Sequence, residues 1–426
     1  QAVTEAIDPA HTLFIVSSKS GGTTETLSFY KYFRELVESA IGKERAGQNF
    51  ITITDMGSSL AGLAVESGFR RVFLNPSDVG GRFSVLSYFG LVPAALMGID
   101  LTRLLARTEL MRKACAAGVP VTENPGALLG GAMSAFTWRG RDKLTLVTSS
   151  SLASFGLWVE QLIAESLGKE GKGIIPVMGE PLADPADYGD DRLFVYLRLE
   201  SDDNSAIDAA VEKIKSAGQP VVTLELRECY DLGAEFFRWE FATAVAGAVL
   251  GVHPFDQPNV QAAKDATGRV LREYHASGHL PHVAVVGALK DLLTGAKSGD
   301  YLTIMAYVYQ TPETDRVLAD LSRKVMARCH IATTSGYGPR LLHSTGQLHK
   351  GGPNTGLFFQ ITAGHRKDMP VPDEADTFGV LADAQALGDL QTLQSLRRRV
   401  ARVHLESVDE LTLERLAGDL VWLAQG

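Results

Sequence analysis

The sequence predicts an α/β protein in which parallel sheets carry helices on their faces. Short, β-prone apolar segments alternate with segments of helical periodicity along most of the chain. A length of 426 residues, with 45% hydrophobic and 21% charged residues, is typical of a globular chain of two or three domains. No apolar run approaches the ~18–20 residues that span a bilayer, so the sequence argues against a membrane protein.

The first part of the chain, residues 1–105, predicts a doubly wound parallel sheet. The predicted strands are Thr12–Val16, Asn49–Thr54 and Arg71–Leu74, and the predicted helices are Thr23–Ala40 and Ser58–Ser67. The first strand follows Gln1 after few residues, and neither an initiator Met nor a signal peptide precedes it. We therefore expect a domain whose front part is missing.

A second α/β series predicts another domain over residues 106–276, joined to the first by a helical stretch at Phe89–Ala117. Its predicted strands are Lys143–Thr148, Arg192–Leu199 and Val221–Leu226. Its predicted helices are Leu152–Leu167, Ala206–Ala217, Phe236–Leu250 and residues 258–275, the last opened by Pro258.

Residues 277–426 predict an α/β C-terminal extension. The predicted elements are strands at His282–Val286, Tyr301–Tyr307 and Leu357–Thr362, a helix near 313–327, a Gly/Pro-rich loop at 335–356 and a helix at Gln385–His404. Within the last helix, we expect the basic cluster Arg397–Arg399 to form a solvated face.

Charge and cysteine content restrict the classes of partner. The 41 basic and 50 acidic residues give a net charge of −9 and a pI near 5.6, without a long basic run, which argues against nucleic acid and anionic membranes as partners. The three cysteines are far apart and form no CxxC pair, so neither a disulfide framework nor a metal site is expected. The cytoplasm is the expected compartment.

The segment Ser18–Thr26 (SKSGGTTET) joins a predicted strand to a predicted helix. Hydroxyl groups, glycines and free amides at a helix N-terminus suit a phosphate group. Ser18, Ser20 and Thr23 are candidate ligands, with Lys19 nearby and Thr26 in the following turn. The alternative is a Ser/Thr-rich helix cap without a ligand.

Two further segments offer single charged candidates. Arg82 follows two glycines in Gly80–Ser84, and a guanidinium is a permanent donor for developing negative charge. Glu165 ends a predicted helix whose face it shares with Leu162 and Gln161, so partial burial is expected to raise its pKa and suit it as a general base. Taken alone, the alternatives are a loop Arg paired with a carboxylate and a surface Glu.

The last two candidates lie later in the chain. Lys264 falls about two turns into the helix opened by Pro258, where a solvated Lys is the alternative. A glycine-rich segment, HSTGQLHKGGPN, carries His343 and His349 at a spacing that matches no standard metal site. A role in proton transfer or hydroxyl binding is favoured there over a metal, with structural histidines as the alternative.

Together, these segments resemble the glucose-6-phosphate isomerase family. SKSGGTTET is similar to that family's sugar-phosphate loop, and SDVGGRFSVLS to its first signature. ESLGK, with Glu165, is similar to the catalytic-glutamate motif, and FDQPNVQAAK, with Lys264, to the second signature. The four motifs follow the family order over residues 12–270. The extension, with HSTGQLHKGGPN, resembles the isomerase half of transaldolase/glucose-6-phosphate isomerase fusions.

The resemblance implies two sugar-isomerase-type (SIS) domains and the interconversion of glucose 6-phosphate and fructose 6-phosphate, in glycolysis and gluconeogenesis. It implies that Glu165 moves the proton between C2 and C1 through a cis-enediol, which Arg82 stabilises. Ring opening would use Lys264 and a histidine, because the family's segment with the ring-opening His has no counterpart with a His in Gly179–Leu199. His349 is the first substitute and His343 the second.

No metal or organic cofactor is expected for this chemistry. A homodimer and covalent fusion to an upstream transaldolase domain are the partner arrangements that the resemblance suggests. Two alternatives to an active enzyme stay open: a regulatory module that only binds sugar phosphates, and an inactive fragment of a bifunctional transaldolase/isomerase. The co-occurrence of Glu165, Arg82 and Lys264 favours the enzyme.

Overall fold

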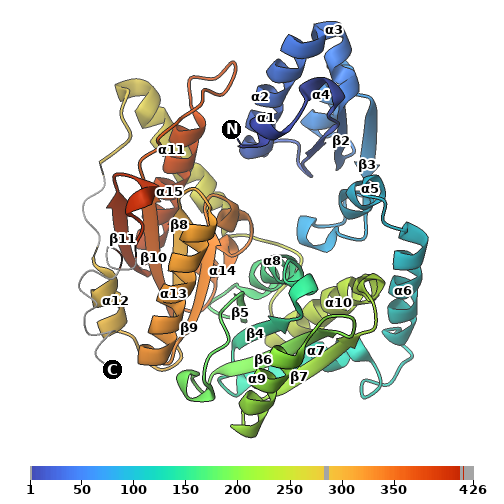
Figure 1. Ribbon diagram of the computed structural model, residues 1–426, viewed down its shortest axis with the longest axis vertical. Coiled ribbons are helices and arrows are strands. Elements are labelled where there is room, and N and C mark those ends of the chain that lie inside the picture. The colour runs from blue at the N-terminus through green and yellow to red at the C-terminus, as the bar shows by residue number, and fades with distance from the viewer. Residues whose placement is uncertain (1, 283–286, 413–415, 417–426) are drawn as a thin grey trace. The chain divides into compact units, whose positions relative to one another are not determined.

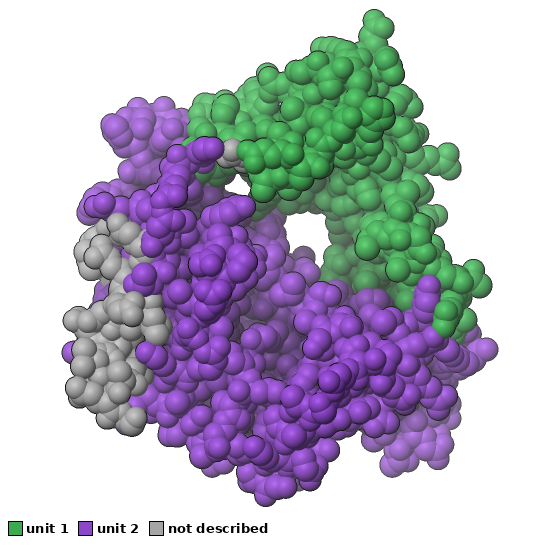
Figure 2. Space-filling view, in the orientation of Figure 1, with its two compact units in different colours: residues 1–106, 368–379 green, residues 107–367, 380–426 purple. Residues whose placement is uncertain are grey.

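The computed structural model describes residues 2–282, 287–412 and 416. The chain forms two compact units, coloured separately in Figure 2. Unit 1 comprises residues 1–106 and 368–379, and unit 2 comprises residues 107–367 and 380–426. Most of the predicted C-terminal extension thus lies in one unit with the predicted second domain.

Unit 1 contains a parallel three-stranded sheet in the order β1-β2-β3 (Figure 1). Its strands are β1 (Phe14–Ser17), β2 (Phe50–Asp55) and β3 (Arg71–Asn75). Its helices are α1 (Ala2–Ala6), α2 (Thr24–Ile41), α3 (Lys43–Ala46), α4 (Ser59–Glu66) and α5 (Tyr88–Leu96). Val16, Tyr30, Phe50 and Leu60 form its buried core, which places α2 and α4 against the sheet. The predicted α/β character of this part is confirmed.

The helical stretch predicted at Phe89–Ala117 consists of two helices. The first is α5, and the second is α6 (Leu101–Ala114). Gly98 lies between them with φ of +82°, a left-handed conformation that ends the first helix.

Unit 2 contains two parallel four-stranded sheets. The first has the order β5-β4-β6-β7. Its strands are β4 (Lys143–Thr148), β5 (Ile175–Met178), β6 (Arg192–Leu199) and β7 (Val221–Leu226). The helices of this region are α7 (Pro125–Trp138), α8 (Phe155–Leu167), α9 (Ser205–Ser216), α10 (Leu232–Leu250) and α11 (Val260–Ser277). The three predicted strands are confirmed at their predicted residues, whereas β5 and α7 were not predicted.

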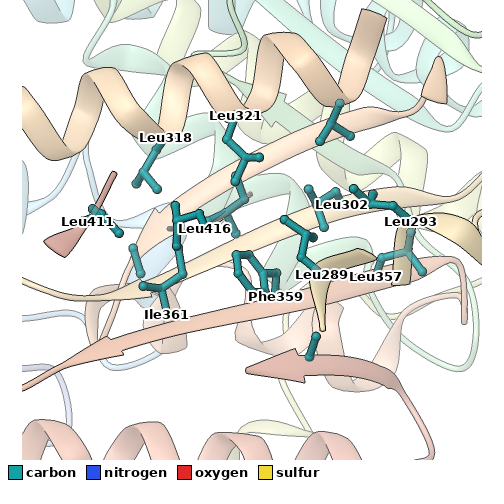
Figure 3. Packing of buried hydrophobic residues seen from close by; sticks show 14 of the residues in the cluster. Leu289, Leu293, Leu302, Leu318, Leu321, Leu357, Phe359, Ile361, Leu411 and Leu416 are labelled. Carbon is teal, nitrogen blue, oxygen red and sulfur yellow. The ribbon is translucent and has the colours of Figure 1, made fainter. Parts of the chain in front are cut away.

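The second sheet of unit 2 has the order β11-β10-β8-β9 (Figure 1). Its strands are β8 (Tyr301–Tyr307), β9 (Ala332–Tyr337), β10 (Gly356–Ala363) and β11 (Arg399–Leu405). Its helices are α12 (Leu289–Thr294), α13 (Pro312–Cys329), α14 (Gly346–Gly351) and α15 (Phe378–Ser395). Figure 3 shows the core on the α12 and α13 side, where Leu289, Leu318 and Leu321 pack against Leu302 and Phe359 of the sheet. On the other face, Ala386 and Leu393 of α15 join the cluster of Met305 and Phe358.

Three predictions for the extension are wrong in part. The helix predicted at Gln385–His404 ends at Ser395, and β11 begins at Arg399. Between them, Arg397 adopts a left-handed φ of +54° without a glycine to mark the turn. The basic cluster at this turn is not wholly solvated, because Arg398 donates to the carbonyls of Lys350 (2.7 Å) and Gly352 (2.8 Å). The predicted loop at 335–356 contains α14.

The strand predicted at His282–Val286 falls on residues 283–286, which lie outside the described part of the chain. Across the residues that the structure does describe, no helix combines the length and apolarity needed to cross a bilayer.

Polar contacts join the two sheets of unit 2 along their edges. Strands β5 and β9 are edge strands of their respective sheets and contact each other. The Glu180 carboxylate, which follows β5, accepts a hydrogen bond from the Thr333 amide of β9 (2.8 Å). The same carboxylate pairs with Arg192 of β6 (2.7 Å), and both side chains are fully buried. The two sheets therefore share one buried polar network.

Candidate active site

The loop between β1 and α2 is held by its own side chains. The Ser18 hydroxyl accepts a hydrogen bond from the Gly21 amide (3.1 Å) and bonds to the Thr23 hydroxyl (2.9 Å). Gly21 has φ of +75°, and a Cβ there would lie 2.7 Å from the Leu60 nitrogen, so the turn requires glycine. Thr23 precedes α2 and makes no side-chain capping bond to it. The loop thus brings hydroxyls and amides to the positive end of an 18-residue helix.

The remaining candidates of this loop differ in their surroundings. Ser20 is exposed, and Thr26 donates a long hydrogen bond to the Ser17 carbonyl (3.5 Å). Lys19 forms an ion pair with Asp55 and donates to the Ser77 carbonyl (2.8 Å). The charge of Lys19 is therefore balanced within unit 1, whereas Ser20 presents its hydroxyl at the surface.

Arg82 lies in a short 3-10 helix, Gly81–Phe83, of the same unit. Its side chain is buried, and the guanidinium carbon lies 5.5 Å from the centre of the Phe83 ring. A cation over an aromatic face gains electrostatic stabilisation. The structure thus holds this permanent positive charge in a buried position.

Glu165 lies in the last turn of α8, in unit 2, and is partly buried. The Gln161 amide, one turn earlier, donates to its Oε2 atom (3.2 Å). The predicted sharing of a helix face by Gln161 and Glu165 is confirmed by this contact. A partly buried carboxylate with a hydrogen-bond donor beside it can serve as a general base.

A second carboxylate of α8, Glu160, was not singled out in the sequence. Glu160 is buried, and burial raises its pKa, against the lowering effects of Arg340 and of a hydrogen bond with Ser344. The Arg340 guanidinium lies 3.7 Å from its Oε1 atom. Arg340 and Ser344 belong to the segment that immediately precedes α14, so these contacts hold that segment against the middle of α8.

The proposed ring-opening groups are unequally accessible. Lys264 is exposed in the second turn of α11, and His343 is exposed at the end of the 3-10 helix Arg340–His343. His349 of α14 is only 2% exposed, and its ring centre lies 5.1 Å from that of Phe358. Burial first, then the positive charges of Lys350 and Arg398, lower the pKa of His349 well below its ordinary value. His349 is therefore a neutral, interior imidazole.

The glycine-rich segment of the extension folds back onto the helix that carries Glu165. Helix α14 contacts both α8 and α11. The Gly171 amide, just after the ESLGK motif, donates to the Gly351 carbonyl (2.9 Å). Gly168 must be glycine, because a Cβ would lie 2.5 Å from the Leu348 Cα. The structure thus brings this segment into contact with the helices that carry Glu165 and Lys264.

Sequence reasoning missed two buried side chains that connect the motifs. Lys169 of ESLGK pairs with Asp256 (2.7 Å) and donates to the His253 carbonyl. Gln347 of α14 bonds to both Gly168 and Asn259. Each of these contacts spans more than 80 residues, so only the fold could identify them.

Comparison with known proteins finds relatives for the first part of the chain. Residues 1–174 match the phosphoglucose isomerase family model. Curated relatives named glucose-6-phosphate isomerase include one from Parabacteroides distasonis, 31% identical over 58% of this chain and 64% of its own length, and one from Symbiobacterium thermophilum, 34% identical over 58% and 63%. The chain therefore spans slightly under two thirds of the length of these relatives.

Solved structures show a similar fold. A hypothetical protein from Thermus thermophilus superposes with a TM-score of 0.56 at 26% identity, over 65% of this chain and 74% of that one. A glucose-6-phosphate isomerase from Chlamydia trachomatis superposes with a TM-score of 0.54 at 18% identity, over 64% and 62%. Residues 1–174 are therefore similar to the glucose-6-phosphate isomerase family.

Proposed function

We propose that this chain catalyses the reversible isomerisation of glucose 6-phosphate and fructose 6-phosphate, a step of glycolysis and gluconeogenesis. The observation that carries the proposal is the partly buried carboxylate of Glu165 in an ESLGK motif within the family-matched region. The names of the curated relatives support the substrate class.

Aldose–ketose isomerisation moves one proton between C2 and C1, and a single carboxylate can remove and return it. Glu165 is proposed as this base, with Gln161 fixing the orientation of its carboxylate (3.2 Å). The cis-enediolate that forms carries negative charge, and Arg82 is proposed to stabilise it. Removing the proton is easier for a carboxylate that is not fully hydrated, which fits the partial burial of Glu165.

The substrate phosphate is proposed to bind at the β1–α2 loop. Ser18, Ser20 and Thr23 supply hydroxyl donors, and the helix N-terminus supplies a favourable dipole. Lys19 and Thr26 are proposed as supporting groups of the same loop. Binding the phosphate holds the sugar in place, which lowers the entropic cost of bringing its reacting carbons to the base.

Ring opening needs an acid and a base before the proton transfer. Lys264 is proposed for this step together with a histidine. The exposure of His343 favours it over His349, whose ring is buried and packs against Phe358. His349 serves in ring opening only if the residues covering it move.

Cytoplasmic location, a homodimer and fusion to a transaldolase domain are further parts of the proposal. They are supported by the acidic, cysteine-poor composition and by the likeness of HSTGQLHKGGPN to the fused isomerases. The mass of the native protein, compared with that of its subunit, tests the homodimer. The mass of the subunit tests the fusion to a transaldolase domain.

The test is a coupled assay for glucose 6-phosphate formed from fructose 6-phosphate, with Glu165→Gln as the diagnostic variant. Turnover is expected to fall by at least ~10²-fold, the lower range for loss of a general base, with the KM little changed. Glu170→Gln, which removes an exposed carboxylate five positions further on, is the matched control and should keep wild-type activity. Wild-type turnover by Glu165→Gln would remove Glu165 from the mechanism.

The competing hypothesis is a module that binds sugar phosphates and regulates a partner. Such a module needs the β1–α2 loop but not a base such as Glu165. Calorimetric titration with glucose 6-phosphate, run beside the assay, separates the two. Binding without turnover by the wild-type chain supports the regulatory module or an inactive fragment.

A further inference from the structure

Gln347 is a buried amide whose hydrogen-bonding groups all point at two other motifs. It lies in α14 and is only 1% exposed. Its Oε1 atom accepts from the Asn259 amide (2.8 Å), and its Nε2 atom donates to the Asn259 Oδ1 atom (2.7 Å) and the Gly168 carbonyl (3.0 Å). A buried amide satisfied at both ends is costly to disturb, because each partner would lose its bond without gaining water.

The two partners of Gln347 are the ends of two helices. Gly168 is the residue after α8, three positions beyond Glu165. Asn259 is the residue before α11, five positions ahead of Lys264. One side chain therefore joins the end of the helix that bears the proposed base to the start of the helix that bears the proposed ring-opening lysine.

The backbone around the Gln347 side chain is closely packed. A Cβ on Gly351 would lie 2.5 Å from the Asn259 Oδ1 atom and 2.8 Å from the Gly168 oxygen. Interiors packed this closely transmit a displacement rather than absorb it. A change at Gln347 is therefore expected to move the end of α8 relative to the start of α11.

We propose that Gln347 is a positioning residue that fixes Glu165 relative to Lys264. This inference rests on the proposed isomerase function. Gln347 itself is buried and does not touch substrate; it acts through the two helix ends. A misplacement of about 1 Å in reacting groups can cost roughly 10²-fold in rate, so a small shift at this bridge affects turnover strongly.

The diagnostic variant is Gln347→Met, which keeps the length of the side chain and removes its hydrogen bonds. We expect kcat to fall at least ~10-fold while the KM for fructose 6-phosphate stays within about twofold, because the phosphate loop is untouched. Gln360→Met is the matched control: Gln360 is also fully buried in unit 2, but its amide donates to the Ala386 carbonyl (2.9 Å), away from both motifs. The control is expected to lose thermal stability and keep kcat within about twofold.

Wild-type kcat in Gln347→Met, or an equal loss of kcat in both variants, overturns the inference. If Gln347→Met does not fold, Gln347→Glu replaces it: that variant keeps the acceptor for the Asn259 amide and replaces the donor with an oxygen that repels Asn259 Oδ1 and the Gly168 carbonyl. The same fall in kcat at unchanged KM is expected there.

Hydrogen exchange keeps the inference testable if the wild-type chain shows no isomerase activity, an outcome that defeats the proposed function alone. The Asn259 amide donates directly to Gln347, so Gln347→Met should speed exchange at Asn259 and in residues 165–173. Gln360→Met should leave these segments at wild-type protection. Unchanged protection in Gln347→Met overturns the positioning role.

Discussion

Glu165 and Glu240 are both carboxylates on helices of unit 2, yet their surroundings give them different chemistry. Glu165 is partly exposed and receives a hydrogen bond from Gln161. Burial raises the pKa of Glu240 to about 8, and its Oε1 atom has no hydrogen-bond partner among the described residues. At neutral pH Glu240 is therefore largely protonated and not a base. A carboxylate's role follows from its hydration and its partners.

Glu240 predicts a pH-dependent stability. Because its folded-state pKa of about 8 lies above the ordinary 4.5, the stability it contributes is present below pH 4.5 and lost as the pH rises through 8. Glu240→Gln cannot ionise, so we expect it to be more stable than wild type by roughly 1–3 kcal/mol at pH 9. Urea unfolding at pH 5, 7 and 9 tests this. A difference that does not grow with pH contradicts the assignment.

The phosphate loop gives a second prediction for single residues. Ser20 is exposed, and its hydroxyl accepts a hydrogen bond from the Gly22 amide (3.3 Å), so Ser20→Ala removes a proposed phosphate donor together with this one contact. Loss of a hydrogen bond to a charged acceptor costs about 1.5–3 kcal/mol, which should appear as a raised KM. Thr23→Ala is expected to act in the same direction.

The control for the loop is Ser39→Ala, which removes an exposed hydroxyl near the other end of α2 and should leave the KM unchanged. Free glucose should be a poor substrate for every form. Equal rates with glucose and glucose 6-phosphate would show that this loop does not bind phosphate.

Among the elements, α14 is one whose secondary structure differs from what its local sequence predicts. Its segment reads as a loop because it holds several glycines. In the structure, six residues of it form a fully buried helix. Lys350 pairs there with Asp389 of α15 at 2.6 Å, and both side chains are at most 2% exposed. Tertiary contacts from another helix thus override a weak helical propensity.

The Lys350–Asp389 pair yields a stability prediction. Asp389→Asn leaves the Lys350 charge buried without a counter-charge, which should cost about 3–5 kcal/mol. The double variant Lys350→Met with Asp389→Leu removes both charges and should recover much of that loss. Urea unfolding of the two variants measures the difference. A double variant no more stable than Asp389→Asn would show that the pair's charges do not dominate.

Sequence reasoning was most reliable for strands with a strong apolar pattern and clear boundaries. Lys143–Thr148 alternates polar and apolar residues over its first four positions, Arg192–Leu199 is mostly apolar, and both are strands at their predicted residues. Strand β5 has only four residues and contains Pro176, so it gave no such signal. The sequence of β11 predicts helix, because the turn at Arg397 contains no Gly or Pro to separate it from α15.

The candidate site was predictable where a motif is local. ESLGK located a partly buried Glu at a helix end, and the structure has it there. The sequence does not indicate Gln347 or Glu160, because their contacts join segments that are far apart in the chain. Gln347 and Gly168, for example, are 179 residues apart. Burial also separates His343 from His349, a difference that spacing alone does not reveal.

Across the whole molecule, the most consequential feature is that the two sheets of unit 2 share buried polar links. The Glu180 carboxylate bonds to both Arg192 of one sheet and the Thr333 amide of the other. Lys143 at the start of β4 donates to the carbonyl of Gly299, just before β8. Separating the sheets would leave these charges and amides buried or unpaired, at a cost of several kcal/mol. The extension is thus part of the folding unit that carries Glu165.

This sharing predicts that the two sheets lose their protection from hydrogen exchange together. Ile304 in β8 is fully buried, and Ile304→Ala should cost about 2–5 kcal/mol through lost burial and the cavity left behind. Because the sheets form one cooperative structure, exchange should speed up in β6 as much as in β8. Leu396→Ala, at a position 43% exposed, is the control and should change neither strand. If β6 keeps wild-type protection while β8 loses it, the two sheets unfold separately, and the second sheet is not part of the folding unit that carries Glu165.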